Sequence, residues 1–546
     1  MDSSELGPLS EEFFDALFDF HPTEGAEAGL HAYDPLTGPR DAEAIARYVA
    51  RLRELGRRLE AVNGETLGPD ERLDRELILR RLHGELLWLD EAGVWHRDPR
   101  FYAAQLDLSL LILSQHAPPE DRLRSIVRRL ESAPSLIEAA RANVRNPPRP
   151  FVEAALVGYR GLPAFLRGSL SEALSPVGDP ALRSRFEAAR DAAAAAIEAY
   201  AAHLADEVLP GAGGEYALGS DLYRRMNVLL AGVDLPIARL EEIGWAEVER
   251  LQTLGESRAD QVVPGGGLEA ALRALGDDAP SPEAIVETAS RDIDGLVRFM
   301  EGEGLATLRP GSVEVRAIPA FRRTNFAYIM LPGPFEPENT GFYFIHPADE
   351  SWSEEETRRF LRRHNRWTIL NTSAHEAYPG HYHHFTHINR APTKAQQLLW
   401  AYVTVEGWAH YSEEMAWRRG LADSSPHLGL AVVQDALLRA VRFLSSIGLH
   451  AQGMAVEESE SLFRTIAFQD PFNARQQALR GTYDPEYLGY TLGKLMILQL
   501  REDLARVRGA KFDLRTFHDE FMARGAPPVP WIARHMLSEP GWQPFR

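Results

Sequence analysis

The residues best suited by type to do chemistry lie in one short histidine-rich stretch. Five of the 18 histidines fall between positions 375 and 387, in the text NTSAHEAYPGHYHHFTH. Histidine is the commonest metal ligand, and Glu376, directly after His375, is the residue type that serves as general base beside a zinc-bound water. Because the chain has no cysteine, thiolate ligands, disulfides and thiol nucleophiles are excluded, and any metal must be held by His, Asp or Glu.

The spacing of the first two ligand candidates departs from the usual H-E-x-x-H signature. His381 follows His375 by six positions instead of four, which on an unbroken helix turns it about 120° away from the first histidine. Pro379 and Gly380 lie between them. Proline clashes with the carbonyl four residues before it, and glycine accepts backbone angles closed to other residues. We therefore predict a break that returns His381 to the side of His375.

Three further histidines follow the break. His383 and His387 are spaced i, i+4, which is good ligand spacing, but no glutamate stands beside them. We therefore interpret this pair as structural, solvated or supporting the ligands from behind. The roles of His383, His384 and His387 are left open.

A third metal ligand is predicted from the segment VTVEGWAHYSEEM at 403–415. Glu406, His410 and Glu413 fall at i, i+4 and i+7, so they share one face of a helix. Glu406 lies 25 residues after His381, a distance that suits a helix, a turn and a second antiparallel helix. We expect Glu406 to bind the metal, with His410 and Glu413 orienting the ligand histidines through hydrogen bonds.

The elements that must position these residues are mainly helical. Apolar residues recur at three- and four-residue spacings over 41–62, 70–90, 120–145 and 182–208, which is typical of amphipathic helices. Strand signals are confined to 312–331 and 341–346. We expect an N-terminal helical lobe over 1–210, and a catalytic lobe over 215–546 that holds a small sheet (312–346), metal-binding helices (365–415) and C-terminal helices.

The amino-acid composition and net charge exclude some classes of binding partner. The 546 residues are 45% hydrophobic and 25% charged, which is typical of a soluble globular protein. The net charge of −20 argues against nucleic acid or an anionic membrane as the main partner. The first residues show no basic segment followed by an apolar run, and no 18-residue apolar run occurs, so we expect a cytoplasmic protein without membrane contact.

The segments HEAYPGH and EGWAHYSEE resemble the bacterial "domain of unknown function 885" family, whose members are similar to gluzincin zinc peptidases such as thimet oligopeptidase and Taq carboxypeptidase. RGTYDPEYLGYTLGKLMILQLR at 480–501 and FHDEFMARGAPPVPWIARHML at 517–537 also fit. The resemblance implies a mainly α, two-lobed, zincin-like metallopeptidase with a small sheet beside the active-site helix. It also implies His375, His381 and Glu406 as zinc ligands, and Glu376 as general base.

The resemblance also places a catalytic tyrosine at Tyr490, three residues before Gly493. We expect Tyr490 to stabilise the oxyanion of the tetrahedral intermediate; Tyr483 and Tyr487 are alternatives. A free substrate carboxylate needs a cation, for which the sequence offers Arg322, Arg323, Arg480 and Lys494.

The function that these residues favour is zinc-dependent hydrolysis of the peptide bonds of short peptides. A zinc amidohydrolase acting on a small non-peptide amide is the alternative enzyme. A non-catalytic peptide- or metal-binding helical protein, or a plain helical scaffold, are the alternatives of another class. One zinc ion is expected, with manganese or cobalt as substitutes that a His2Glu site accepts. A homodimer is left open.

Overall fold

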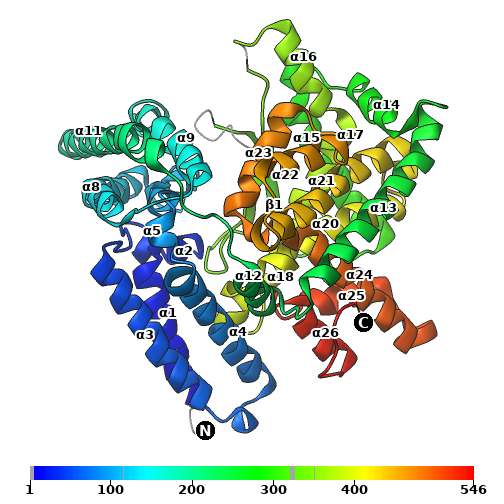
Figure 1. The fold of residues 1–546 in the computed structure, drawn as a ribbon, viewed down its shortest axis with the longest axis horizontal. Coiled ribbons are helices and arrows are strands. Elements are labelled where there is room, and N and C mark those ends of the chain that lie inside the picture. Colours follow the sequence, from blue (N-terminus) through cyan, green and yellow to red (C-terminus); the bar gives the residue numbers. More distant parts are fainter. Residues whose placement is uncertain (1–4, 115, 320–325, 350, 546) are drawn as a thin grey trace. The chain divides into compact units, whose positions relative to one another are not determined.

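The computed structural model describes residues 5–114, 116–319, 326–349 and 351–545 (Figure 1). The expected mainly helical chain with a small sheet is confirmed. Packing divides the chain into two compact units: Met1–Tyr216 with Gly333–Pro337, and Ala217–Pro332 with Glu338–Arg546. Residues 333–337 thus pack with the N-terminal unit although they follow strands of the other one. No helix in the described part is both long and apolar enough to span a bilayer.

The described secondary structure of the first unit is helical. Its helices are α1 (Leu6–Phe20), α2 (Pro22–Glu27), α3 (Ala42–Ala61), α4 (Pro69–Leu86), α5 (Val94–Arg97), α6 (Arg100–Ala103), α7 (Ser109–Leu113), α8 (Pro119–Asn143), α9 (Arg149–Phe165), α10 (Ser171–Ala173) and α11 (Pro180–His203). The long ones match the amphipathic patterns. Helix α11 packs along α8, and the fully buried Ala193 and Ala194 are small enough to let a neighbouring helix come close.

The second unit contains the histidine-rich stretch. Its helices are α12 (Ser220–Met226), α13 (Ile237–Val262), α14 (Gly267–Ala274), α15 (Ile285–Glu303), α16 (Glu354–Arg363), α17 (Arg366–Glu376), α18 (His381–Ile388), α19 (Lys394–Leu398), α20 (Tyr402–Arg418), α21 (Pro426–Ala451), α22 (Val456–Thr465), α23 (Pro471–Tyr483), α24 (Gly489–Arg508), α25 (Leu514–Met522) and α26 (Val529–Leu537).

The sheet has three strands in the order β1-β3-β2. Strand β3 (Thr340–Ile345) pairs in parallel with β1 (Ser312–Ala317) and antiparallel with β2 (Ala327–Met330). The single strand signal read over 312–331 therefore corresponds to two strands that each pair with β3. Part of it, residues 320–325, lies outside the described residues. Strand β2 and helix α15 both lie against α17.

Two helices of the second unit cross with their backbones in contact. A Cβ added to Gly407 on α20 would lie 2.5 Å from the Cα of Gly493 on α24, and one added to Gly493 would lie 1.9 Å from the carbonyl oxygen of Val403. Only glycine allows so close an approach. The crossing fixes Tyr490, nearly one turn before Gly493, beside Tyr402 at the start of α20, with ring centroids 5.8 Å apart.

Candidate metal centre

The predicted break between the two histidines is present. Helix α17 ends at Glu376 and α18 begins at His381. The chain turns so tightly that a Cβ on Gly380 would lie 1.8 Å from the carbonyl oxygen of His375. The Gly380 amide donates to the carbonyl of Ala374 at 2.9 Å. The turn brings the imidazole of His381 back to that of His375, with ring centroids 4.7 Å apart.

Glu406 completes a three-residue group with these histidines. Its Oε2 lies 3.6 Å from Nε2 of His375 and 3.4 Å from Nε2 of His381, and the three donor atoms all lie within 4.8 Å of one another. Two protein atoms that each bind one zinc ion at 2.0–2.2 Å lie about 3.3 Å apart, so the separations suit a shared ion.

The polar atoms of this group also fit a cation. Oε2 of Glu406 is buried and accepts no hydrogen bond from any described residue. A buried carboxylate oxygen without a donor is costly, and a metal ion would satisfy it. Glu406 is also the one residue of 403–417 in α20 that is partly exposed, so part of its side chain reaches accessible space while its neighbours are packed away.

Glu413 orients the first histidine from behind. Its Oε1 lies 2.6 Å from Nδ1 of His375, so the Nδ1–H donates to this carboxylate and Nε2 is free for a metal. Asn371 and Arg439 each donate to Oε2 of Glu413 at 3.2 Å. The hydrogen bond that we expect between Glu413 and a ligand histidine is therefore present. His410 makes no such hydrogen bond among the described residues. Its Nδ1 lies 3.6 Å from Glu413, and neither of its ring nitrogens has a described hydrogen-bond partner.

The charges of the group support one another. Burial opposes a charged His375, but the interactions with Glu406 and Glu413 outweigh it and raise the pKa of His375 to about 9. Burial likewise opposes a charged Glu406, yet the adjacent His381 and His375 hold the pKa of this carboxyl well below its usual range. Glu406 therefore stays ionised, and a cation bound between the histidines would take the place of the proton that His375 carries in the metal-free group.

The two side chains predicted to be catalytic, Glu376 and Tyr490, lie beside the three-residue group. Glu376 is half-buried beside the group; burial and the negative charge of Glu406 raise its pKa. The ring of Tyr490 stacks at 6.4 Å on that of His375, and burial together with the charge of Glu406 raises the pKa of its hydroxyl. Tyr490 therefore stays protonated at neutral pH and can donate a hydrogen bond.

One face of α21, the face that carries Arg439, is partly exposed. Most of this helix is buried, but Gln434, Asp435, Leu438, Arg439 and Arg442 are partly exposed. Their spacing places them on a single face. Arg439 on this face pairs with Glu413 at 3.1 Å, so α21 reaches the carboxylate that orients His375.

The remaining candidates are placed away from the group or are already engaged. The buried Tyr487 donates to Oγ of Ser445 at 2.8 Å, and Tyr483 is half-buried at the end of α23. Arg480 pairs with Asp484 at 2.7 Å. Lys494 is fully buried and pairs with Glu247 and Glu414 at 3.2 and 2.7 Å. Arg322 and Arg323 lie outside the described residues.

The other three histidines of the stretch are buried in α18. His387 donates from Nε2 to the carbonyl of Thr307 at 2.8 Å. The rings of His383 and His384 have no described hydrogen-bond partner, and burial lowers the pKa of both far enough to keep them neutral.

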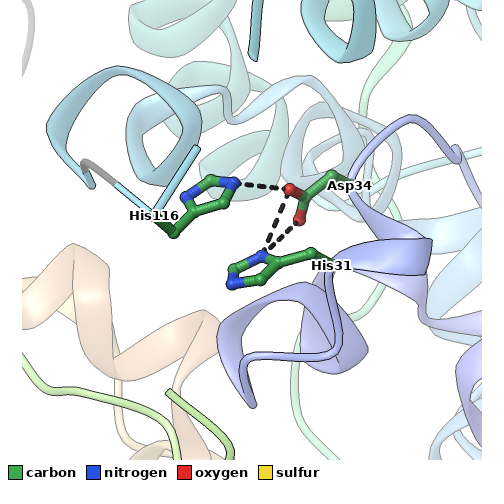
Figure 2. Close-up of side chains that lie close together, drawn as sticks. All are labelled: His31, Asp34 and His116. Atoms are coloured by element: carbon green, nitrogen blue, oxygen red, sulfur yellow. Dashed lines mark hydrogen bonds and ion pairs between the residues drawn. The ribbon is translucent and has the colours of Figure 1, made fainter. Parts of the chain in front are cut away.

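A second His/Asp group, in the first unit, was not anticipated from the sequence. In Figure 2 the carboxylate of Asp34 lies beside His31 and His116 and bridges them. It is 3.2 Å from Nδ1 of His31 and 2.8 Å from Nε2 of His116. The two rings stack at 3.8 Å with their planes 6° apart. An imidazole binds a metal through a lone pair in its ring plane, so parallel stacked rings cannot both point at one ion. We read this group as hydrogen bonding around Asp34.

Fold and site together describe a large, mainly helical protein with a three-stranded sheet and a His2Glu group at a helix break. Residues 22–536 match the family described as "Bacterial protein of unknown function (DUF885)". The chain belongs to this family, which confirms that part of the resemblance.

Two solved structures share the fold. One, described as a candidate lipoprotein of unknown function from Shewanella oneidensis, has a TM-score of 0.81 at 24% identity, over 98% of this chain and 100% of that chain. The other, a candidate lipoprotein from Colwellia psychrerythraea, has a TM-score of 0.82 at 18% identity, over 98% and 99%. No curated protein matches the chain.

Proposed function

We propose that this protein is a zinc-dependent hydrolase of the gluzincin kind, with a zincin-like catalytic lobe, that cleaves peptide or other amide bonds. The observation that carries the proposal is the convergence of His375, His381 and Glu406 within 4.8 Å, with Glu376 next in sequence to the first ligand. A protein that only stored metal would have no need of a partly exposed glutamate at that position.

The chain's own residues have the roles that amide hydrolysis requires. His375, His381 and Glu406 would hold a zinc ion, which when bound would lower the pKa of a water and polarise the substrate carbonyl. Glu376, whose pKa is raised, takes the proton of the attacking water and passes it to the leaving amine. Tyr490 donates a hydrogen bond to the oxygen that becomes negative. Strand β2, at a sheet edge beside α17, offers backbone groups to an extended substrate.

The substrate class and location belong to the proposal. We propose a short peptide, with a small non-peptide amide as the alternative substrate of the same chemistry. We retain the cytoplasm as location and zinc as the metal, with manganese or cobalt as substitutes. A peptide- or metal-binding protein without turnover is the alternative of another class.

Metal analysis and one isosteric variant test the proposal. We expect one zinc ion per chain in the purified protein and less in Glu406→Ala. Against a panel of short peptides and N-acyl compounds, Glu376→Gln should keep the metal and lose at least about 100-fold in rate. Glu287→Gln, on the exposed face of α15, is the matched control. Metal-free protein, or unchanged turnover in Glu376→Gln, would overturn the proposal.

A further inference from the structure

We propose that Arg442 binds the free carboxylate of the substrate, so that the enzyme removes short C-terminal pieces or splits very short peptides. This inference rests on the proposed function and names its substrate class.

Three arginines surround Tyr490, and two of them already have a carboxylate. Arg439 pairs with Glu413 at 3.1 Å and Arg480 pairs with Asp484 at 2.7 Å. Arg442 has no carboxylate partner in the part of the chain that the structure describes. Its Nε donates to the neutral amide oxygen of Gln477 at 2.8 Å, and its two terminal nitrogens are left to bind something else.

The surroundings of Arg442 favour an incoming anion. Burial lowers the pKa of its guanidinium, and the positive charges of Arg480 and Arg439 lower it further. A partly buried cation facing two others is costly unless a negative charge joins it. A carboxylate is the planar anion that the guanidinium fork binds through two parallel hydrogen bonds.

The position of Arg442 connects this anion site to the metal group. Arg442 lies three residues after Arg439 on the partly exposed face of α21. Its Cζ lies 5.2 Å from the centre of the Tyr490 ring, and that ring lies 6.4 Å from the ring of His375. With about 3.3–3.6 Å per extended residue, these separations leave room for about one to three residues between the scissile carbonyl and the terminal carboxylate.

The test compares two peptides that differ only in a free or an amidated C-terminus. The wild-type protein should prefer the free acid in kcat/KM. Arg442→Gln should lower kcat/KM for the free acid roughly 10- to 100-fold and leave the amidated peptide nearly unchanged. Arg442→Lys, which keeps the charge but not the fork, should fall between. Arg464→Gln, exposed on α22, should match the wild type. Equal losses on both peptides, or none, would overturn the proposal.

A binding measurement separates this inference from the proposed activity. Glu376→Gln is titrated calorimetrically with the same two peptides, so no turnover is required. Tighter binding of the free acid that disappears in Glu376→Gln/Arg442→Gln supports the carboxylate site even if the wild-type protein hydrolyses neither peptide, a result that would refute the hydrolase alone. Equal binding of both peptides would refute the carboxylate site and leave the hydrolase standing.

Discussion

Nδ1 of His375 and Oε1 of Glu413 lie 2.6 Å apart, and the carboxylate that makes this contact is itself held by Asn371 and Arg439. The ring of His375 is therefore oriented by three elements, α17, α20 and α21. Such a carboxylate behind a ligand histidine fixes the tautomer and raises the basicity of the nitrogen that faces the metal.

The first prediction removes the charge of this carboxylate. Glu413→Gln should weaken metal binding about 10- to 100-fold, because the amide neither fixes the His375 tautomer nor balances Arg439. Competition with a chelator of known affinity measures the loss. Glu457→Gln, which removes an exposed carboxylate of α22 paired with Arg475, is the control. Unchanged metal affinity in Glu413→Gln would mean that this carboxylate does not support a ligand.

The second prediction concerns the turn between the two histidines. Gly380→Ala places a Cβ 1.8 Å from the carbonyl of His375, so the turn must open and His381 must move away from Glu406. We expect loss of metal binding and a destabilisation of several kcal/mol, as for other strained backbone sites. Gly295→Ala, in α15 with nothing within 4 Å of the new Cβ, should be neutral or stabilise by up to about 1 kcal/mol. Metal titration and thermal melting of both variants compare them.

Much of the site follows from local sequence. The break is predictable because Pro379 and Gly380 act on the backbone next to them, and the placement of Glu406 follows from helical periodicity within one segment. The helical class is predictable for the same reason, since each amphipathic pattern lies within one element.

What the sequence does not reveal depends on contacts between distant segments. His410 and Glu413 share a face of α20, yet of the two only Glu413 contacts His375. Which of them reaches the ligand depends on where α17 and α21 pack against α20, and the sequence of α20 alone does not contain that information. Lys494 reads as a free cation until its partner Glu247, 247 positions away, is placed beside it. Arg442 belongs to no motif. It stands out only because Arg439 and Arg480 each pair with a carboxylate, whereas Arg442 pairs with none among the residues that the structure describes.

The third prediction tests the buried ion pairs of Lys494. Lys494 is fully buried between Glu247 and Glu414, and Arg250 also contacts both carboxylates. Lys494→Met should destabilise the fold by about 3–5 kcal/mol, because it leaves buried negative charge with one counterion fewer. Lys494→Met/Glu247→Leu should recover part of the loss. Denaturant unfolding measures both, and a single variant as stable as the wild type would contradict the expectation.

The last prediction concerns pH and lies outside the metal group. Asp292 on α15 is buried, one of its oxygens has no described hydrogen-bond partner, and burial raises its pKa to about 7. Since the folded pKa exceeds the unfolded value of about 3.9, the unfolded chain releases this proton first as pH rises. The resulting stability loss begins near pH 4 and is complete above about pH 7, where it amounts to roughly 4 kcal/mol.

Asp292→Asn should remove this loss. The variant should be more stable than the wild type at pH 8, by about 2 kcal/mol once the imperfectly bonded amide is included. This advantage should fall as the pH drops and reverse near pH 4, where only the cost of the amide remains. Asp294→Asn, exposed on the same helix, should follow the wild type at both values. Melting temperatures from pH 4 to 8 make the comparison. A variant whose stability parallels the wild type across that range would show that Asp292 is ionised in the folded protein at little cost.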